Sequence, residues 1–305
     1  MRLWLGRTAF ALAALLLVMT FFNASWLAPA PAGVIKLVAP HGVAQLATTG
    51  SAAPCPAATD PPVHDYSEGT RRALDAARRL GTDMIGLRPT AAADGRLLAF
   101  PPCPGQPSPA SLAEALATLP ATSILFQLTS DDPAEADRLA AALAAAGRDV
   151  IARRDAFSGP PRAIDRIHLL YPAAWSWSPA AAARCASAYR LTGWTGIIPA
   201  ACRNGTLIVT LDHQWRLWGW PNRLLARMAR GHAHVIVAAA TNADGSLKGL
   251  DRPEQLGEVP STFKGWIWVD DPWTVAPALY PDRDFRDEAQ VKAAQAGLAR
   301  RAASR

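Results

Sequence analysis

The chain has 305 residues, of which 50% are hydrophobic and 18% are charged. This composition excludes a disordered protein and a small disulfide-held peptide, because it supplies enough apolar side chains for a sizeable core. The formal net charge of +6 is small for this length, and no block of five or more basic residues occurs. Nucleic acid is therefore not expected as a partner.

Residues 1–28 have the pattern of an export segment. Arg2 and Arg7 precede an uncharged run from Thr8 to Ala28. Basic residues before an apolar run keep the N-terminus in the cytoplasm and send the rest of the chain across the membrane. A cleavage site at 28–30 would leave Pro31 next in line, which is a poor context, so we expect an uncleaved transmembrane anchor. The alternative is a signal peptide that is removed, releasing the protein into the periplasm.

The remainder of the chain divides into three parts. Residues 29–33 form a Pro/Ala-rich linker, 34–281 form the folded domain, and 282–305 form a charged C-terminal tail that is either a helix or a frayed segment. With the anchor retained, we expect a single-pass protein of a bacterial-type inner membrane with its C-terminal domain in the periplasm.

The four cysteines are widely spaced and form no CxxC pair. They are Cys55, Cys103, Cys185 and Cys202. An even number of cysteines in an exported chain favours two disulfides over a zinc site. Three pairings are possible, and we expect Cys55 with Cys103 and Cys185 with Cys202; unpaired buried thiols are the alternative.

Strand and helix patterns alternate about eight times along the domain. Apolar runs typical of buried strands occupy 34–38, 83–87, 96–100, 123–128, 149–152, 166–171, 196–199 or 206–211, 234–239 and 265–269. Helical patterns occupy 68–80, 111–119, 133–146, 179–191, 221–230 and 252–257. Strands that are apolar throughout suit a parallel sheet covered on both faces. The pattern predicts an α/β fold, a TIM (β/α)8 barrel preceded by one N-terminal transmembrane or signal helix.

The segment 67–100 resembles the opening of the glycerophosphodiester phosphodiesterase family. Ser67-Glu68-Gly69-Thr70, then Leu80-Gly81-Thr82-Asp83-Met84-Ile85, then Asp94-Gly95 follow the family's order and nearly its spacing. The segments 123–129, 235–242 and 265–270 resemble its third, seventh and eighth strands. The resemblance implies a TIM barrel that hydrolyses glycerophosphodiesters or lipid head-group phosphodiesters with a bound Ca²⁺ or Mg²⁺.

The residues that the family uses for chemistry are replaced here. Its His-Arg-Gly falls on Pro40-His41-Gly42, and its metal-binding Glu-x-Asp falls on Gly86-Leu87-Arg88. The following His-Asp falls on Pro101-Pro102, and the third-strand Glu-x-Lys falls on Gln127-Leu128-Thr129. A hard cation needs several converging oxygen ligands. We therefore expect no metal cofactor and two possible functions, phosphodiester hydrolysis from a displaced site or a catalytically inactive member that binds an anionic envelope ligand or a protein partner.

Active sites of TIM barrels lie at the C-terminal ends of the strands. There we expect His41 as a general base or nucleophile, and Arg88, Gln127 and Arg153 as ligands for an anion such as a small phosphodiester. The alternatives are a His41 that only hydrogen-bonds a loop, and an Arg88 that pairs with a carboxylate such as Asp270.

Overall fold

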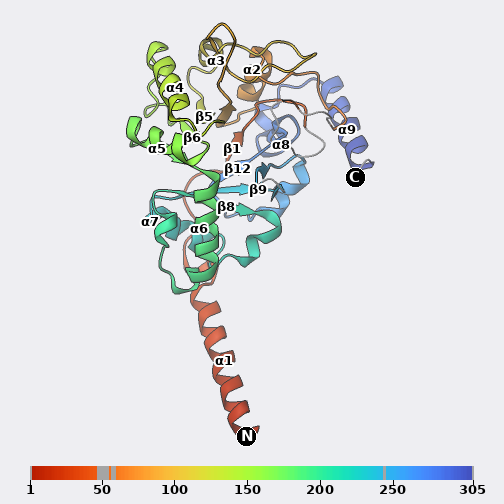
Figure 1. Ribbon diagram of the computed structural model, residues 1–305. Helices are drawn as coiled ribbons and strands as arrows, with labels where there is room; N and C mark the ends of the chain where they lie inside the picture. Colours follow the sequence, from red (N-terminus) through yellow and green to blue (C-terminus); the bar gives the residue numbers. More distant parts are fainter. Residues whose placement is uncertain (1, 47–54, 56–59, 243–244, 304–305) are drawn as a thin grey trace.

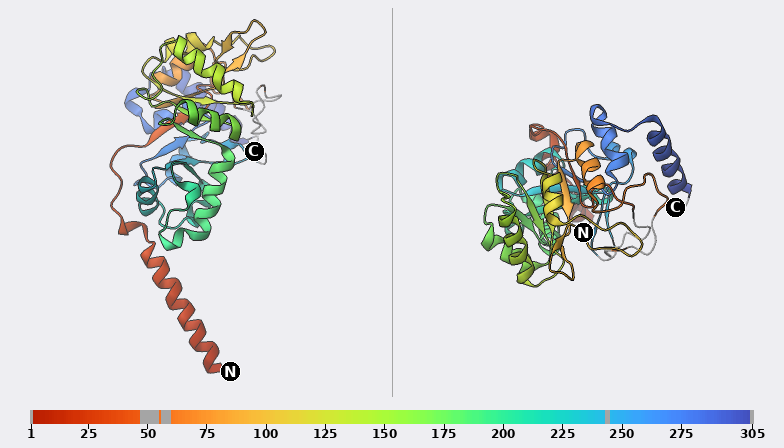
Figure 2. Two further views of the ribbon diagram at one scale, coloured as in Figure 1. Left: turned by 60° about the vertical axis from the view of Figure 1, so that its left-hand side comes forward. Right: turned by 90° about the horizontal axis from the view of Figure 1, so that it is seen from above.

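The computed structural model describes residues 2–46, 55, 60–242 and 245–303. An N-terminal helix, α1 (Arg2–Phe22), projects from the end of a rounded body, and Figure 1 and Figure 2 show it pointing away from every other element. Within the described part of the chain, no helix is both long enough and apolar enough to cross a membrane.

Eight strands form one parallel sheet, in the order β7-β6-β5-β2-β1-β12-β9-β8. Their bounds are β1 (Lys36–Ala39), β2 (Met84–Leu87), β5 (Ser123–Gln127), β6 (Ala156–Ser158), β7 (Trp175–Trp177), β8 (Thr206–Thr210), β9 (His234–Ala238) and β12 (Trp266–Trp268). The sheet is a nearly closed barrel in which β7 and β8 are neighbours without a backbone ladder between their described residues. The expected TIM barrel is confirmed, with a seam between β7 and β8.

Helices follow most of the strands and cover the outside of the sheet (Figure 2). They are α2 (Arg71–Arg79), α3 (Leu112–Thr118), α4 (Pro133–Ala145), α5 (Pro161–Leu170), α6 (Pro179–Thr192), α7 (Asn222–Arg230), α8 (Pro272–Leu279) and α9 (Glu288–Ala303). Short 3₁₀ turns are η1 (Ser25–Leu27), η2 (Gly193–Thr195), η3 (Ala200–Cys202), η4 (Leu211–Arg216), η5 (Pro253–Glu258) and η6 (Pro281–Arg283). Two hairpins, β3 (Thr90–Ala91) with β4 (Leu97–Leu98) and β10 (Ala240–Thr241) with β11 (Leu247–Lys248), extend from the barrel.

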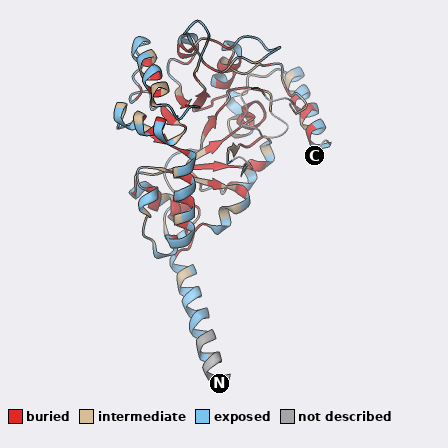
Figure 3. Cartoon of the chain, in the orientation of Figure 1, coloured by how far each residue is buried: buried red, intermediate tan, exposed pale blue. Residues whose placement is uncertain are grey.

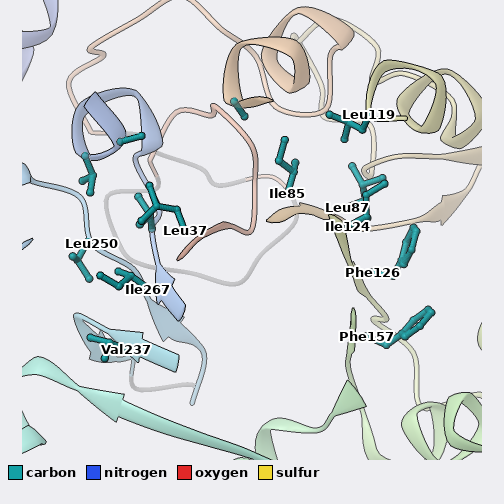
Figure 4. Packing of buried hydrophobic residues seen from close by; sticks show 14 of the residues in the cluster. Leu37, Ile85, Leu87, Leu119, Ile124, Phe126, Phe157, Val237, Leu250 and Ile267 are labelled. Carbon is teal, nitrogen blue, oxygen red and sulfur yellow. The ribbon is translucent and has the colours of Figure 1, made fainter. Parts of the chain in front are cut away.

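Alternate residues of each strand enter two separate cores, because successive side chains of a strand point to opposite faces. On β1, Leu37 packs toward the helices whereas Val38 faces the barrel interior. Figure 4 shows Leu37, Ile85 and Phe126 in the outer core, and Figure 3 shows the strands as the most buried part of the molecule. The inner core is smaller and includes Trp177 and Trp268.

Two aspartates hold the N-terminal ends of the strands in place. Asp83 accepts a hydrogen bond from the amide of Leu37 at 2.8 Å, and Asp155 accepts one from the amide of Ile124 at 2.8 Å. Asp155 is also paired with Arg148 at 2.7 Å, and both side chains are almost fully buried. A buried ion pair is tolerated only where further hydrogen bonds satisfy its polar atoms, and Arg148 supplies them by donating to the carbonyls of Leu119 and Thr122.

Two predicted strands are wrong. Residues 149–152 form a turn, and the fourth barrel strand is β6, which begins at Ala156. Residues 166–171 mostly belong to α5, where Ala163, Ile164 and Ile167 form a buried face with helical spacing. An apolar run of five or six residues fits the end of a helix as well as a strand, because its length does not separate the two.

Both expected disulfides are present, Cys55 with Cys103 and Cys185 with Cys202. The C-terminal segment 282–305 is not frayed over its described residues, since α9 buries Ala294, Gly297 and Arg301. Arg301 pairs with Asp271 at 2.6 Å, and both side chains are buried, so α9 is part of the domain.

The C-terminal end of α1 is tied to the body by a buried polar network. Arg227 of α7 donates to Asn23 Oδ1 at 2.8 Å and to the carbonyl of Gly193 at 2.9 Å. Asn23 in turn donates to the carbonyl of Trp194 at 2.9 Å. Asn23 comes before the predicted linker 29–33 in the chain. The helix is therefore joined to the body directly, and its position does not depend on that linker.

Candidate functional site

A cavity of about 630 Å³ opens at the C-terminal ends of the barrel strands. It is lined by residues that follow β1, β2, β5 and β12, by the β10–β11 hairpin, and by one face of α6. This is the end of the barrel at which TIM-barrel active sites lie.

His41 is held at the cavity by Glu68. The two side chains meet through His41 Nδ1 and Glu68 Oε1 at 2.7 Å, and both are partly exposed. His41 follows β1 and Glu68 lies in the loop before α2. Gly42 has a φ of +62°, a left-handed conformation that glycine adopts without strain, and it allows the chain to turn directly after His41. A carboxylate on one ring nitrogen orients the imidazole and leaves the other nitrogen as a base.

Asp270 lies deep in the same cavity, directly after the eighth barrel strand. Its Oδ2 accepts a hydrogen bond from the amide of Gly249 at 2.7 Å, while its buried Oδ1 has no partner among the described residues. Burial raises the pKa of Asp270 to about 6, against the opposing effect of the nearby His41 charge. The carboxyl can therefore hold a proton close to neutral pH.

Arg88 and Lys248 supply positive charge. Both line the cavity, and neither side chain forms an ion pair with a described residue. The alternative pairing of Arg88 with Asp270 is thus not found. The lining also includes carboxylates, namely Asp60, Glu68, Asp212, Asp251 and Asp270, so the charge around the mouth is mixed.

The positions that the resemblance assigns to metal ligands are filled by protein contacts. Gln127 Nε2 donates to the carbonyl of Pro40 at 2.7 Å. A side chain at Gly86 would collide with the backbone of Pro40, and Arg88 places a cation where the family has a carboxylate. Among the described residues, no group of three or more His, Cys, Asp or Glu side chains converges as metal ligands would. The residues present do not fit the family's divalent cation.

One face of α6 lines part of the cavity. The face that lines it carries small side chains at helical spacing, Ala182, Ala183, Ala186 and Ser187, and ends at Arg190. Trp177, Ile208 and Trp268 line it as well. The lining of the cavity therefore has an apolar part as well as a polar part.

The structure brings most of the predicted site residues together. His41, Arg88 and Gln127 all line the cavity, and so does Asp270. Asp271 follows Asp270 but is committed to its buried pair with Arg301.

The predicted position of Arg153 at the C-terminal ends of the strands is wrong. It precedes β6 and is exposed, and its carbonyl accepts a hydrogen bond from Ser123 at the N-terminal start of β5. It therefore lies at the opposite end of the barrel. The error follows from the mistaken strand at 149–152, which would have put Arg153 at a C-terminal strand end.

Sequence reasoning missed Glu68, Lys248 and the α6 face. Glu68 stands inside the Ser67-Thr70 motif, which was the available signal, but only the fold shows that it reaches His41. Lys248 lies in a two-residue strand, β11, which carries no periodic signal.

Comparison with known proteins gives a fold-level match. No family model matches the chain, and no curated protein sequence matches it either. Among solved structures, a glycerophosphodiester phosphodiesterase from Agrobacterium tumefaciens is similar at 15% identity with a TM-score of 0.51, over 80% of this chain and 99% of that chain. A glycerophosphoryl diester phosphodiesterase domain from Mycobacterium tuberculosis is similar at 12% identity with a TM-score of 0.50, over 82% of this chain and 100% of that domain.

These similarities confirm the predicted resemblance at the level of the fold. The barrel has the architecture of glycerophosphodiester phosphodiesterases and spans nearly the full length of the two solved structures. A shared fold does not establish a shared reaction, since function depends on the residues of the site.

Proposed function

We propose that the cavity cleaves a small phosphodiester by general acid–base catalysis without a bound metal ion. The observation that carries this proposal is the His41–Glu68 pair at the C-terminal end of the barrel, at 2.7 Å. A base held by a carboxylate within hydrogen-bonding distance is the arrangement that activates a nucleophile in many hydrolases.

Three groups divide the chemistry. With Nδ1 of His41 directed to Glu68, Nε2 accepts a proton from the attacking water as its oxygen bonds to phosphorus. Asp270, whose pKa burial raises to about 6, gives its proton to the ester oxygen as the P–O bond breaks. Arg88 and Lys248 offset the negative charge that builds on the phosphoryl oxygens.

The fold supports the substrate class. The solved structures of this fold include glycerophosphodiester phosphodiesterases. A phosphodiester of glycerol or of a lipid head group would place its phosphate near Arg88, while hydroxyl or ammonium groups would find the cavity carboxylates.

A second candidate is a catalytically inactive protein that binds an anionic envelope ligand. The observation that favours it is the hydrogen bond from Gln127 to the carbonyl of Pro40. This bond engages the side chain at a position where the family has a metal ligand. Arg88 and Lys248 would then bind phosphate without turning it over.

The test is hydrolysis of glycerophosphocholine and bis(p-nitrophenyl) phosphate by the full chain, with and without EDTA. We expect turnover to survive EDTA and to fall by about 100-fold in His41→Ala and in Glu68→Gln, within the range of general acid–base contributions. Arg153→Ala is the matched control and should leave the rate unchanged, because Arg153 lies at the other end of the barrel.

Two results would overturn the catalytic proposal. Turnover that disappears with EDTA would assign the reaction to a metal ion. A lack of turnover together with a glycerophosphocholine-dependent rise in melting temperature, lost in Arg88→Ala but not in Arg153→Ala, would establish the binding protein instead.

We also propose that the domain works in an oxidising compartment, the periplasm. The two disulfides support this location, since disulfides persist where thiols are not kept reduced.

A further inference from the structure

An apolar surface surrounds the base of α1. It consists of Trp26, Leu27, Leu191, Trp194 and Ile197, whose exposed fractions range from 40% to 76%. We refer to these five residues as the basal patch. Single exposed apolar residues are ordinary, but a cluster of large ones marks an interaction surface.

The basal patch comes from two segments of the chain, residues 26–27 and residues 191–197, and hydrogen bonds show that the two segments share one surface. Asn23 Nδ2 donates to the carbonyl of Trp194 at 2.9 Å, which joins the end of α1 to η2. Ser25 Oγ accepts from the amide of Asn222 at 3.0 Å, which joins η1 to α7. Figure 1 shows α6 and α7 at the end of the body from which α1 projects.

The segment that contains α6 and α7 carries the positive charge of the chain. Residues 179–233 contain seven arginines and a single acidic residue, Asp212, giving a net charge of +6, which equals the net charge of all 305 residues. The rest of the chain is therefore neutral in sum. Arg190 and Arg230, near the ends of α6 and α7, are both exposed.

The apolar surface continues onto α1. Phe10, Leu15, Leu17 and Phe22 are each more than half exposed. A protruding apolar helix and a group of exposed aromatic and aliphatic side chains at its base are thus joined to α6 and α7, whose last turns carry the exposed Arg190 and Arg230.

We propose that this end of the molecule docks on a lipid bilayer containing anionic lipids, with the basal patch at the level of the head groups. Tryptophan is favoured at that depth because its ring is apolar and its N–H is polar. Arginine stems lie along apolar surface while their guanidinium groups reach lipid phosphates. The docking does not depend on the proposed reaction.

The experiment is hydrogen exchange on the full chain in nanodiscs of phosphatidylcholine with 30% phosphatidylglycerol, compared with the same chain in amphipol. We expect about tenfold slower exchange in the segment 190–198 in the anionic discs, because lipid contact suppresses local opening. Leu169 of α5 is 75% exposed but lies outside the basal patch. The segment around it should therefore exchange at the same rate in nanodiscs and in amphipol.

A charged substitution in the basal patch tests its contribution separately from that of α1. Ile197→Glu should abolish the slower exchange, whereas the matched control Leu169→Glu should leave it intact. Unchanged exchange at 190–198 in anionic discs would overturn the proposal. So would protection that appears in amphipol and grows with protein concentration, since that result assigns the patch to a second copy of the chain.

Discussion

Asp270 makes the stability of the fold depend on pH. Its pKa rises from 3.8 to about 6 on folding, so between these values the folded chain keeps a proton that the unfolded chain has lost. The stabilisation from that proton is complete below pH 3.8 and is lost as the pH rises to about 6. The shift corresponds to about 3 kcal/mol of unfolding free energy.

We therefore predict that Asp270→Asn removes this dependence. The difference in unfolding free energy between wild type and variant should change by about 2 kcal/mol between pH 4 and pH 7, with the wild type relatively more stable at pH 4. Urea denaturation at the two pH values measures it. Burial lowers the pKa of His64 and of His234, which has the opposite effect on stability, but both histidines are common to the two proteins and cancel in the difference. A difference that does not vary with pH would contradict the prediction.

Arg227 is a second residue with a large expected effect. Its buried guanidinium bonds Asn23 Oδ1, the hydroxyl of Tyr189 and the carbonyl of Gly193. Arg227→Met would leave buried acceptors without a donor, at a cost of about 2–4 kcal/mol in unfolding free energy. Arg230→Met, on the exposed last turn of the same helix, should change it by less than about 0.5 kcal/mol. Similar losses in the two variants would show that the network does not hold α1.

At the scale of elements, the α6 face sets the room available to a ligand. Ala183 lines the cavity and is exposed, so a larger side chain there meets open space. We predict that Ala183→Leu raises the KM or Kd for long amphiphilic phosphodiesters by about tenfold, because the larger side chain takes up space in the cavity beside α6. Glycerophosphocholine has no long chain to place there and should bind as before. Isothermal titration with both ligands decides the point, and equal weakening of both would contradict it.

The sequence predicts elements that lie in clear apolar runs or carry a clear cap. The strand at 123–128 and the helix at 133–146 are confirmed nearly to the residue, and the helix has the Pro133 start and the Asp132 cap that favour it. The three-residue strands β6 and β7 were not predicted, whereas the equally short β12 was, because it lies within the apolar run 265–269.

The clarity of the local sequence pattern also explains which site residues were predicted. His41 and Arg88 were predicted because each directly follows a strand that the sequence marks clearly. Glu68 and Lys248 come from a loop and a two-residue strand, whose positions depend on tertiary contacts that no local pattern encodes.

At the scale of the whole molecule, the disulfide between Cys185 and Cys202 holds α6 beside the seam. It joins the middle of α6, the helix after β7, to the turn η3 that leads into β8, and it closes a loop of 17 residues. Loop closure of this length accounts for about 3 kcal/mol of stability in the chain-entropy estimate. We predict that the double variant Cys185→Ala/Cys202→Ala loses about that much unfolding free energy. Calorimetry of the two proteins measures it, and an unchanged melting temperature would contradict it.

The seam has one more consequence, which concerns other copies of the chain. A closed barrel has no free strand edges, but among the residues that the structure describes β7 and β8 share no ladder, and Trp175 Nε1 donates to Thr206 Oγ1 across the seam at 2.9 Å. Free edges are templates on which another chain adds a strand. α6 contacts β8, and its Ala182 belongs to the inner core together with Trp177 of β7. We therefore expect the helix that shapes the cavity also to hinder edge-to-edge pairing with another chain.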